Sequence, residues 1–233
     1  MRGGSQIHLN VRAITFDDFY TLRYPVSPTR DMVCVILERL RQLGLDFNAR
    51  RFLNQYNVEN EHYQEERKKT LRESLLEYTV LRALTACGYE SEAIETIARE
   101  AVDSGRASRK TRWFPNAKQT LRKLRENGYR LGLISNTRLR ISEDQMKEYA
   151  QFFDAVTLSY EHGYVKPHPS IFIVTLNKLR VDANHCLHVG DNPISDVMGP
   201  KNVGMKTAFI RRDKTKTRAD IEIRCLTELL SYV

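Results

Sequence analysis

The chain has 233 residues and a net charge of +8, and 41% of its residues are hydrophobic and 28% charged. This length suits one domain, or a core with a smaller inserted domain, and the composition is that of a globular protein with a buried core. No apolar run is long enough to cross a bilayer and no secretory signal is recognisable, so we expect neither a membrane protein nor an exported one.

The first ten residues, MRGGSQIHLN, carry no pattern of a helix or strand, and we expect residues 1–10 to be a disordered leader. Four cysteines are scattered along the chain without a CxxC pair: Cys34, Cys87, Cys186 and Cys225. Isolated cysteines of this kind are typical of buried free thiols in a reducing compartment, so we expect a cytoplasmic protein. The basic residues lack interleaved aromatics or a recognised motif, which argues against a nucleic-acid partner.

The stretch VRAITFDDFYTL, residues 11–22, predicts a short buried strand that ends at an acidic pair. Val11, Ala13, Ile14 and Phe16 form the apolar run, and Asp17 follows at the point where the strand must stop. In open α/β sheets the carboxyl ends of the strands form the ligand-binding edge. Asp17 is therefore the first candidate for a reacting group.

After this strand the pattern becomes helical for about eighty residues. The linker RYPVSPTRD is followed by a helix from about residue 29 to Gly44, a long helical stretch over 49–86 and a further helix from Ser91. From residue 113 onward, strands predicted over 131–135, 155–159, 186–190 and 207–210 alternate with helices predicted over 143–151, 169–179 and 194–202, and a last helix covers 226–232. We therefore predict an α/β core, residues 11–24 and 113–233, with a doubly wound parallel sheet and an all-helical insert over 25–112.

Polar residues follow each of the later apolar runs of the core. Ser135 and Asn136 end one run, Lys166 precedes a proline, and Asp191 follows Gly190 with Asp196 beyond it. Because the carboxyl ends of parallel strands share one edge of a sheet, these side chains would converge on the same cleft as Asp17.

In their order and spacing these motifs resemble the haloacid dehalogenase (HAD) superfamily of hydrolases, from about residue 11 to the end of the chain. The resemblance implies a HAD-like Rossmannoid core and identifies the helical insert as a cap domain. It also implies that Asp17 is the nucleophile, in the register given by Thr21-Leu22, and that Lys166 neutralises charge between nucleophile and substrate. Ser135 would orient a substrate oxygen, with Asn136 and Thr21 completing the substrate-binding set.

The three aspartates also predict a metal site. Asp17, Asp191 and Asp196 would repel one another unless a cation lay between them, and carboxylate oxygens suit Mg²⁺. In the family the cation is also held by the backbone carbonyl two residues after the nucleophile, here that of Phe19. Asp196 is expected as a second ligand or an outer partner, and the alternative is a carboxylate at the start of a helix.

Phe19 is a departure from the family's phosphatases, which carry Asp there as the general acid. Losing a positioned acid costs about 10²- to 10⁴-fold in rate. Asp18 does not replace it, because adjacent residues at a strand end point to opposite sides. The haloacid dehalogenases also lack this acid, but they use no metal and carry Ser-Asn rather than Gly-Asp in the fourth motif.

We therefore expect a Mg²⁺-dependent hydrolase that uses Asp17 on a small phosphorylated or similarly anionic substrate, as an atypical phosphatase. Two alternatives stay open at this point: a 2-haloacid dehalogenase-like hydrolase, and a HAD-fold binding protein that has lost catalysis. Substrate identity, oligomeric state and the residues of the insert that set specificity do not follow from the sequence.

Overall fold

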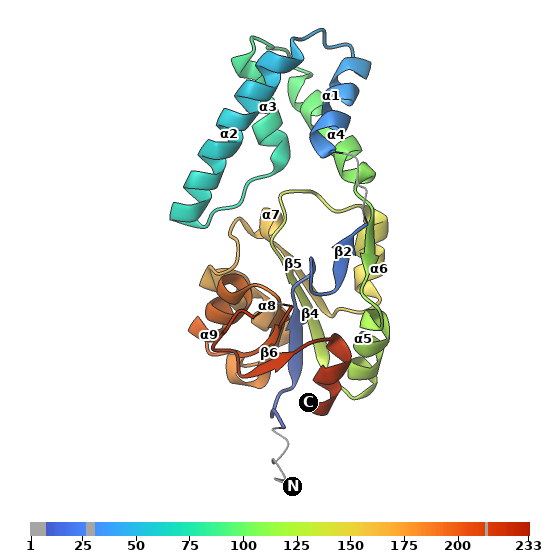
Figure 1. The fold of residues 1–233 in the computed structure, drawn as a ribbon, viewed down its shortest axis with the longest axis vertical. Coiled ribbons are helices and arrows are strands. Elements are labelled where there is room, and N and C mark those ends of the chain that lie inside the picture. Colours follow the sequence, from blue (N-terminus) through green and yellow to red (C-terminus); the bar gives the residue numbers. More distant parts are fainter. Residues whose placement is uncertain (1–7, 27–30, 213) are drawn as a thin grey trace. The chain divides into compact units, whose positions relative to one another are not determined.

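A computed structural model describes residues 8–26, 31–212 and 214–233 of the chain. The chain divides into two compact units (Figure 1). We call residues up to 24 together with 113–136 and 141–233 the core unit, and residues 25–112 together with 137–140 the helical unit. Residues 137–140, which the sequence placed in the core, group with the helical unit.

The core unit is built on six parallel strands in the order β5-β4-β1-β6-β7-β8. The strands are β1 (Ala13–Phe16), β4 (Arg130–Ser135), β5 (Ala155–Leu158), β6 (Cys186–Gly190), β7 (Lys206–Ile210) and β8 (Ile221–Ile223). The chain leaves β1 toward β4 and β5 on one side and later fills β6 to β8 on the other. The predicted doubly wound parallel sheet is confirmed, and β1 lies at the switch point of its topology, where ligands bind in such sheets.

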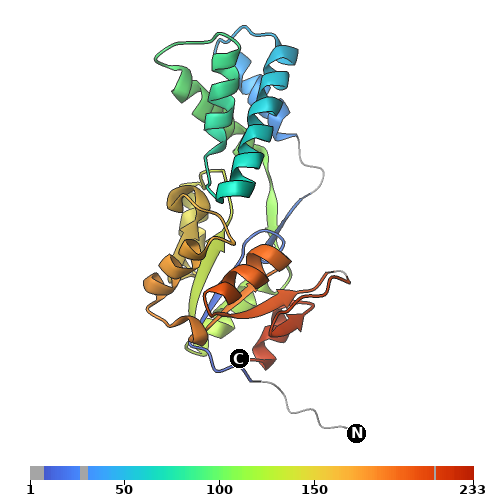
Figure 2. The same ribbon diagram turned by 90° about the vertical axis from the view of Figure 1, so that its left-hand side faces the viewer.

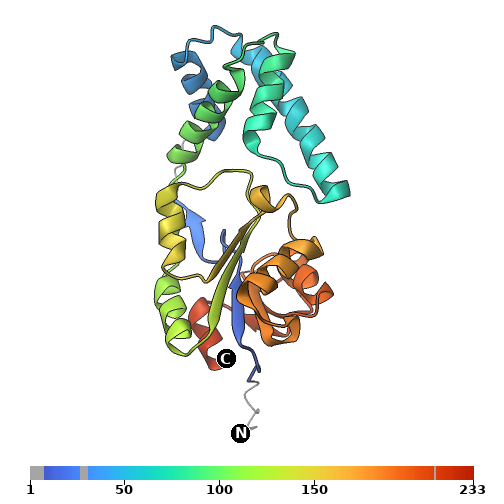
Figure 3. The same cartoon turned by 180° about the vertical axis from the view of Figure 1, so that it is seen from behind.

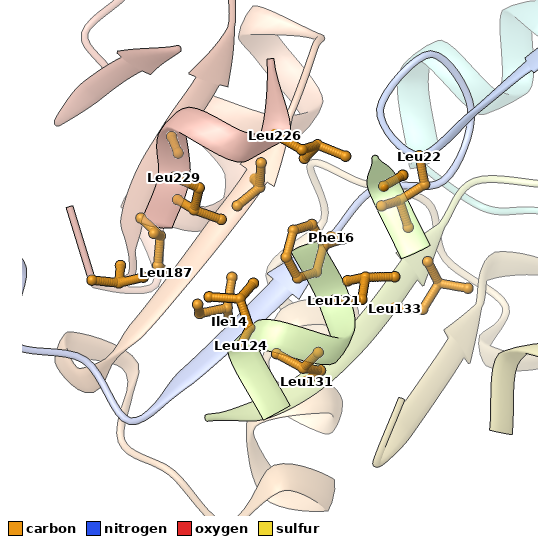
Figure 4. Close-up of a cluster of buried hydrophobic side chains, with 14 of the residues drawn as sticks. Ile14, Phe16, Leu22, Leu121, Leu124, Leu131, Leu133, Leu187, Leu226 and Leu229 are labelled. Atoms are coloured by element: carbon orange, nitrogen blue, oxygen red, sulfur yellow. The ribbon is translucent and has the colours of Figure 1, made fainter. Parts of the chain in front are cut away.

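Helices cover both faces of this sheet (Figures 1 and 3). On one face lie α5 (Ala117–Glu126) and α6 (Glu143–Ala150), and on the other lie α8 (Pro169–Leu179) and α9 (Gly199–Asn202). Figure 4 shows the cluster around Phe16 under α5, to which Leu121 and Leu124 of the helix contribute. Because both faces are covered, β1 and β6 are buried along their whole length, and β4 is buried at every residue after Arg130.

The alternation of side chains along β1 divides the core into two layers. Ile14 and Phe16 belong to the cluster beneath α5, whereas Ala13 belongs to the cluster beneath α8. Gly132 in β4 allows α8 to approach closely, since a Cβ there would lie 3.0 Å from side-chain carbons of both Leu179 and Thr15.

The C-terminal part of the core contains elements that the sequence did not predict, or predicted differently. β8, which follows β7 at the edge of the sheet (Figure 2), is only three residues long. The helix predicted from residue 194 is a π-helical segment, η2 (Pro193–Met198), that continues into α9. The remaining short elements are α7 (Ser159–His162), η1 (Ala183–His185) and η3 (Leu226–Ser231), the last of which replaces the predicted terminal helix.

The helical unit contains four helices in the part of the chain that is described: α1 (Met32–Gln42), α2 (Ala49–Thr70), α3 (Leu76–Ala86) and α4 (Ile94–Ser108). The single helical stretch predicted over 49–86 is therefore two helices. Leu71 ends α2 with φ of 54°, a left-handed conformation that cannot continue a right-handed helix. α1 packs against α4, and α3 packs against both α2 and α4.

Two short strands lie where the chain passes between the units. β2 (Arg23–Pro25) and β3 (Thr111–Trp113) form a two-stranded sheet in stretches that read as linkers in the sequence. Proline in such a short edge strand is compatible with pairing, because only one side of the strand must donate hydrogen bonds.

Two smaller expectations are corrected. Residues 1–7 of the predicted leader lie outside the described residues, but Leu9 is packed in the core and its N–H donates to the Tyr232 carbonyl at 2.7 Å. All four thiols are free, but only Cys186 is buried, whereas Cys34 and Cys225 are exposed. Cys34 lies on the outer face of α1, away from the buried residues Ile36, Leu37 and Leu40.

Candidate active site

The candidate site starts at the carboxyl end of β1. Asp17 directly follows Phe16, and its N–H donates to the Val189 carbonyl of the neighbouring strand β6 at 2.9 Å. This bond extends the ladder by one residue beyond the strand, so the backbone of Asp17 is held by the sheet. The side chain is buried at the carboxyl ends of the strands, the edge of the sheet where the sequence placed it.

Lys166 joins two of the predicted site aspartates. Its Nζ lies 2.6 Å from Asp17 Oδ1 and 2.7 Å from Asp196 Oδ1, and the lysine side chain is buried. Burial alone would lower the pKa of Lys166, but the two carboxylates outweigh it and raise the pKa above its usual range. The lysine is therefore an ammonium ion, with two of its three protons directed at these carboxylates.

Asp191 and Asp196 are brought to the same place by the turn after β6. One carboxylate oxygen from each of Asp17, Asp191 and Asp196 lies within 4.8 Å of the others. Asp196 is aimed by the Asn192 N–H, which donates to its Oδ2 at 2.9 Å. A Cβ on Gly190 would lie 2.3 Å from the Asp196 Cβ, so only glycine permits this packing.

The carboxylates of the cluster differ in their affinity for protons. Burial raises the pKa of Asp17 to about 7, although Lys166 acts in the opposite direction. Burial also raises the pKa of Asp191. For Asp196 burial would have the same effect, but Lys166 and the hydrogen bond from His188 hold its pKa well below the usual range.

This donor set fits a divalent cation. When all four groups are ionised, three carboxylates and one ammonium carry a net charge of −2, so the lysine alone does not neutralise the cluster. Oxygen donors of this kind are those that Mg²⁺ prefers. The group that would hold the ion is Asp17, Asp191 and Asp196, with the Phe19 carbonyl remaining a prediction from the family resemblance.

His188, which sequence analysis did not single out, is part of the same cluster. It is fully buried in β6, with Nε2 at 3.3 Å from Asp196 Oδ1 and Nδ1 at 2.8 Å from Thr15 Oγ1. Burial lowers its pKa, so the imidazole is neutral at physiological pH. Its only signal in the sequence was a polar residue inside an otherwise apolar strand.

Three further residues were predicted to bind the substrate: Ser135, Thr21 and Asn136. Ser135 is the last residue of β4 and is buried at the strand ends. Thr21 directs its hydroxyl to Asp191 Oδ1 at 3.5 Å, which places it beside a predicted metal ligand. Asn136 is engaged with Lys166 at both amide atoms: its Nδ2 donates to the Lys166 carbonyl at 3.0 Å, and its Oδ1 accepts from the Lys166 N–H at 2.8 Å. Asn136 thus holds the lysine backbone in place, a contact that the sequence did not reveal.

Asp18 points away from this cluster into an ion pair. Its carboxylate accepts hydrogen bonds from Arg23 at 2.9 and 2.6 Å and from the Tyr149 hydroxyl at 2.7 Å. Asp18 is therefore committed to a structural contact. Phe19 follows it in the turn, and its ring lies edge-on to that of Tyr20 with 5.3 Å between the centroids.

Comparisons with known proteins support the class of protein that this fold and this cluster define, a hydrolase with carboxylates and a lysine at the carboxyl edge of a parallel sheet. The family described as haloacid dehalogenase-like hydrolase matches residues 47–210. This match covers well over half of the chain. The chain therefore belongs to the haloacid dehalogenase-like hydrolase family.

Individual relatives are named as phosphatases. A glyceraldehyde 3-phosphate phosphatase of Pyrococcus abyssi is 43% identical over 105 residues, which is 44% of each chain. The four relatives of that name, at 33–43% identity, are matched over only about half of their own length. A ribulose-1,5-bisphosphate 5-phosphatase of Halopiger xanaduensis is 25% identical over 236 residues, covering 95% of this chain and 98% of that protein.

The fold is shared with solved structures of the same superfamily. A 2-haloacid dehalogenase from Pseudomonas syringae pv. Tomato DC3000 superposes with a TM-score of 0.72 at 23% identity, over 95% of this chain and 97% of that one. At this identity the likeness concerns the fold alone. Among the described residues no helix has the length and apolar character needed to span a membrane.

Proposed function

We propose that the protein is a Mg²⁺-dependent phosphatase of small phosphorylated substrates, with Asp17 as the nucleophile and with a preference for good leaving groups. The observation that carries this proposal is the cluster of Asp17, Asp191 and Asp196, whose oxygens lie within 4.8 Å of one another, with Lys166 on the first and the last of them. The relatives named as phosphatases of glyceraldehyde 3-phosphate and ribulose bisphosphate support a small phosphorylated substrate.

Asp17 is suited to attack because its N–H is held by the sheet and its Oδ1 by Lys166, which together fix the carboxylate at the end of the strand. In the proposed reaction a carboxylate oxygen of Asp17 forms a bond to phosphorus, and the bond from phosphorus to the leaving oxygen breaks. Water then cleaves the acyl phosphate, which releases phosphate and restores the carboxylate. A bound Mg²⁺ would supply positive charge that stabilises the negative charge on the transferred group.

Ser135 and Lys166 have supporting roles in this proposal. Ser135 would donate its hydroxyl to a phosphoryl oxygen, because it lies at the end of the strand next to β1. Lys166 would place a fixed positive charge beside the reacting carboxylate, and Asn136 holds its backbone at two points. A preorganised charge of this kind costs no reorganisation during the reaction.

Phe19 and Asp18 together explain why the leaving group matters. Phe19 has no proton to donate, and Asp18 is occupied by Arg23 and Tyr149. The leaving oxygen must therefore depart without a positioned general acid, which is tolerable for an acyl phosphate or an aryl phosphate but slow for an alkyl phosphate. We also propose that the helical unit is a cap that selects the substrate, and that the protein acts in the reducing environment of the cytoplasm.

The test is a series of substrates that differ in leaving group, assayed with Mg²⁺ and with EDTA. Acetyl phosphate and p-nitrophenyl phosphate should be hydrolysed at least about 100-fold more efficiently than glycerol phosphate, and EDTA should abolish both activities. Phe19→Asp should narrow that difference by accelerating the alkyl ester. Equal rates across the series in the wild-type protein would contradict the proposed role of Phe19.

The same assay discriminates the alternatives. A dehalogenase would release chloride from 2-chloropropionate in the presence of EDTA, and the fold shared with solved dehalogenases is the observation that keeps this candidate in the test. A binding protein without catalysis would turn over none of these compounds, while Phe19→Asp would gain phosphatase activity over a silent parent.

A further inference from the structure

Arg138 follows β4 of the core unit in the chain, but its side chain contacts residues of the helical unit. Its Nε donates to the Ser74 carbonyl at 3.2 Å, its Nη1 donates to Asn60 Oδ1 at 3.0 Å, and its Nη2 donates to the Thr79 hydroxyl. The guanidinium also stacks on Tyr63, with Cζ 3.4 Å from the ring centroid. Four contacts from three segments of the helical unit thus fix one side chain in a single orientation.

The backbone of Arg138 and the two residues after it also contact the helical unit. The Leu76 N–H at the start of α3 donates to the Arg138 carbonyl at 3.0 Å, and Leu139 packs against the apolar core of the helical unit. Arg140 forms an ion pair with Glu77 at 2.9 Å. The segment 137–140 is therefore an integral part of the helical unit, although it follows β4 of the core in the chain.

The residues just before this segment are held just as firmly by the core unit. Ser135 is the last residue of β4 and is paired in the sheet with Leu158 of β5. Asn136 exchanges two hydrogen bonds with the backbone of Lys166, at 3.0 and 2.8 Å. Asn136 and Arg138 are thus anchored to different units while being only two residues apart in the chain.

Two residues give almost no slack, since consecutive Cα atoms are about 3.8 Å apart and an extended chain spans at most about 3.6 Å per residue. If the helical unit shifts against the core by more than this short connection can absorb, either the Arg138 contacts break or Asn136 moves. Movement of Asn136 acts on the backbone of Lys166, whose Nζ lies on Asp17 and Asp196.

We infer that Arg138 is a positioning residue that ties Asn136, and through it Lys166, to the helical unit, so that the state of the helical unit sets the alignment of the lysine with Asp17. This inference rests on the proposed function for its kinetic consequences. Its structural consequence, the coupling of Arg138 to the Lys166 backbone, does not depend on any activity.

The first experiment measures that coupling without a substrate. Arg138→Met removes the donors and keeps the length of the side chain, and hydrogen exchange followed by mass spectrometry reports on the Lys166 N–H, which donates to Asn136. We expect exchange in the peptide containing Lys166 to rise about 10-fold or more in Arg138→Met. Arg82→Met, which removes an exposed arginine of the same unit paired with Glu59 at 3.8 Å, should leave it unchanged. Unchanged exchange at Lys166 in Arg138→Met would overturn the inference.

The second experiment is a double-mutant cycle in the phosphatase assay. Arg138→Met should lower kcat/KM for acetyl phosphate by about 10- to 100-fold in the wild-type background, mainly through kcat, because small misplacements of a catalytic group are costly. In an Asn136→Ala background the same change should cost less than about 2-fold, since the connection is already broken. Equal losses in both backgrounds would show a purely structural role and overturn the inference.

Two further variants keep the test informative if Arg138→Met does not fold. Thr79→Val and Asn60→Ala each remove one acceptor of the guanidinium and should raise exchange at Lys166 by a smaller factor in the same direction. If neither variant nor Arg138→Lys alters the exchange at Lys166, the inference is wrong. If no phosphate compound is hydrolysed by the wild-type protein, the proposed function fails while the exchange experiment still decides the coupling.

Discussion

Asp18 accepts two hydrogen bonds from Arg23, at 2.9 Å from Nε and 2.6 Å from Nη2, while the adjacent Asp17 faces Lys166. Both pairs are buried, and the two carboxylates point to opposite sides of the chain where β1 ends. Neighbouring aspartates of identical chemistry therefore have separate tasks, one in the fold and one in the candidate active site.

Asp18→Asn should destabilise the protein strongly. The change leaves Arg23 as a buried charge without its carboxylate, and breaking a buried ion pair typically costs about 3–5 kcal/mol. Urea unfolding followed by circular dichroism measures the loss. Lys147→Gln, which removes an exposed pair with Asp144, is the control and should cost less than about 1 kcal/mol. A comparable cost for the two variants would contradict the structural role of Asp18.

Asp17→Asn should abolish turnover and leave the fold intact. The amide cannot form the proposed acyl phosphate, so kcat should fall by at least about a thousandfold, as is usual when a nucleophile is removed. Steady-state assays with acetyl phosphate test this, and near-UV circular dichroism checks the fold. Residual activity within tenfold of the wild type would exclude Asp17 as the nucleophile.

Gly190→Ala should disrupt the carboxylate cluster. The added Cβ would lie 2.3 Å from the Asp196 Cβ and 2.4 Å from its Cγ, so Asp196 must shift from the position in which it contacts Lys166. Overpacking of this kind costs about 1–3 kcal/mol, and we expect Mg²⁺ binding measured by calorimetry to weaken as well. Ile194→Ala removes an exposed side chain in the same turn and serves as the control. Unaltered Mg²⁺ affinity in Gly190→Ala would show that Asp196 is not needed for the ion.

His188→Phe should weaken metal binding without adding a pH dependence. The phenyl ring fills a similar volume but removes the Nε2 contact to Asp196, and losing an outer partner of a metal ligand typically costs about 10- to 100-fold in affinity. Burial keeps His188 neutral, so it should not titrate near the pKa of an ordinary histidine. The Mg²⁺ affinities of the wild type and of His188→Phe should therefore depend on pH in the same way in that range. Titration calorimetry at several pH values measures both effects. His162→Phe is the matched control, and an equal loss in both variants would count against a role of His188.

Asp220→Asn should reduce stability at neutral pH but not in acid. Asp220 accepts from the N–H and hydroxyl of Thr207 in β7, at 2.7 and 3.0 Å, and from Lys201 at 2.8 Å. Partial burial would raise the pKa of Asp220, but these donors outweigh it and hold the pKa below its ordinary value of 3.8. A carboxylate with a depressed pKa stabilises the fold above its unfolded value and loses this contribution as pH falls through the folded one.

The cost of Asp220→Asn should be about 1 kcal/mol at pH 7, since the carboxylate is one-third exposed and its contacts are screened by solvent. Urea unfolding at pH 7 and at pH 3 measures the difference between the variant and the wild type. A difference of the same size at both pH values would refute the linkage.

Local patterns in the sequence predicted much of the core. The apolar runs before Asp17 and Asp191 specified β1 and β6, and the helix of residues 169–179 has the predicted limits, because periodicity and capping residues act over a few positions. The order of the polar endings also indicated that Asp17, Lys166, Asp191 and Asp196 would meet. What these endings have in common is that each follows a parallel strand, so the fold class itself implies a shared edge.

Other features were decided only by the tertiary structure. The bond between Tyr149 and Asp18 spans 131 positions, and nothing in the local sequence selects these partners. The local sequence likewise did not predict the contact of His188 with Asp196 or the contacts of Arg138 with the helical unit. Short elements such as β2, β3 and β8 were missed because three residues carry too little pattern. Periodicity determines which face of a segment is buried, but the partner of a buried charge is selected by whichever group the folded chain places within hydrogen-bonding distance.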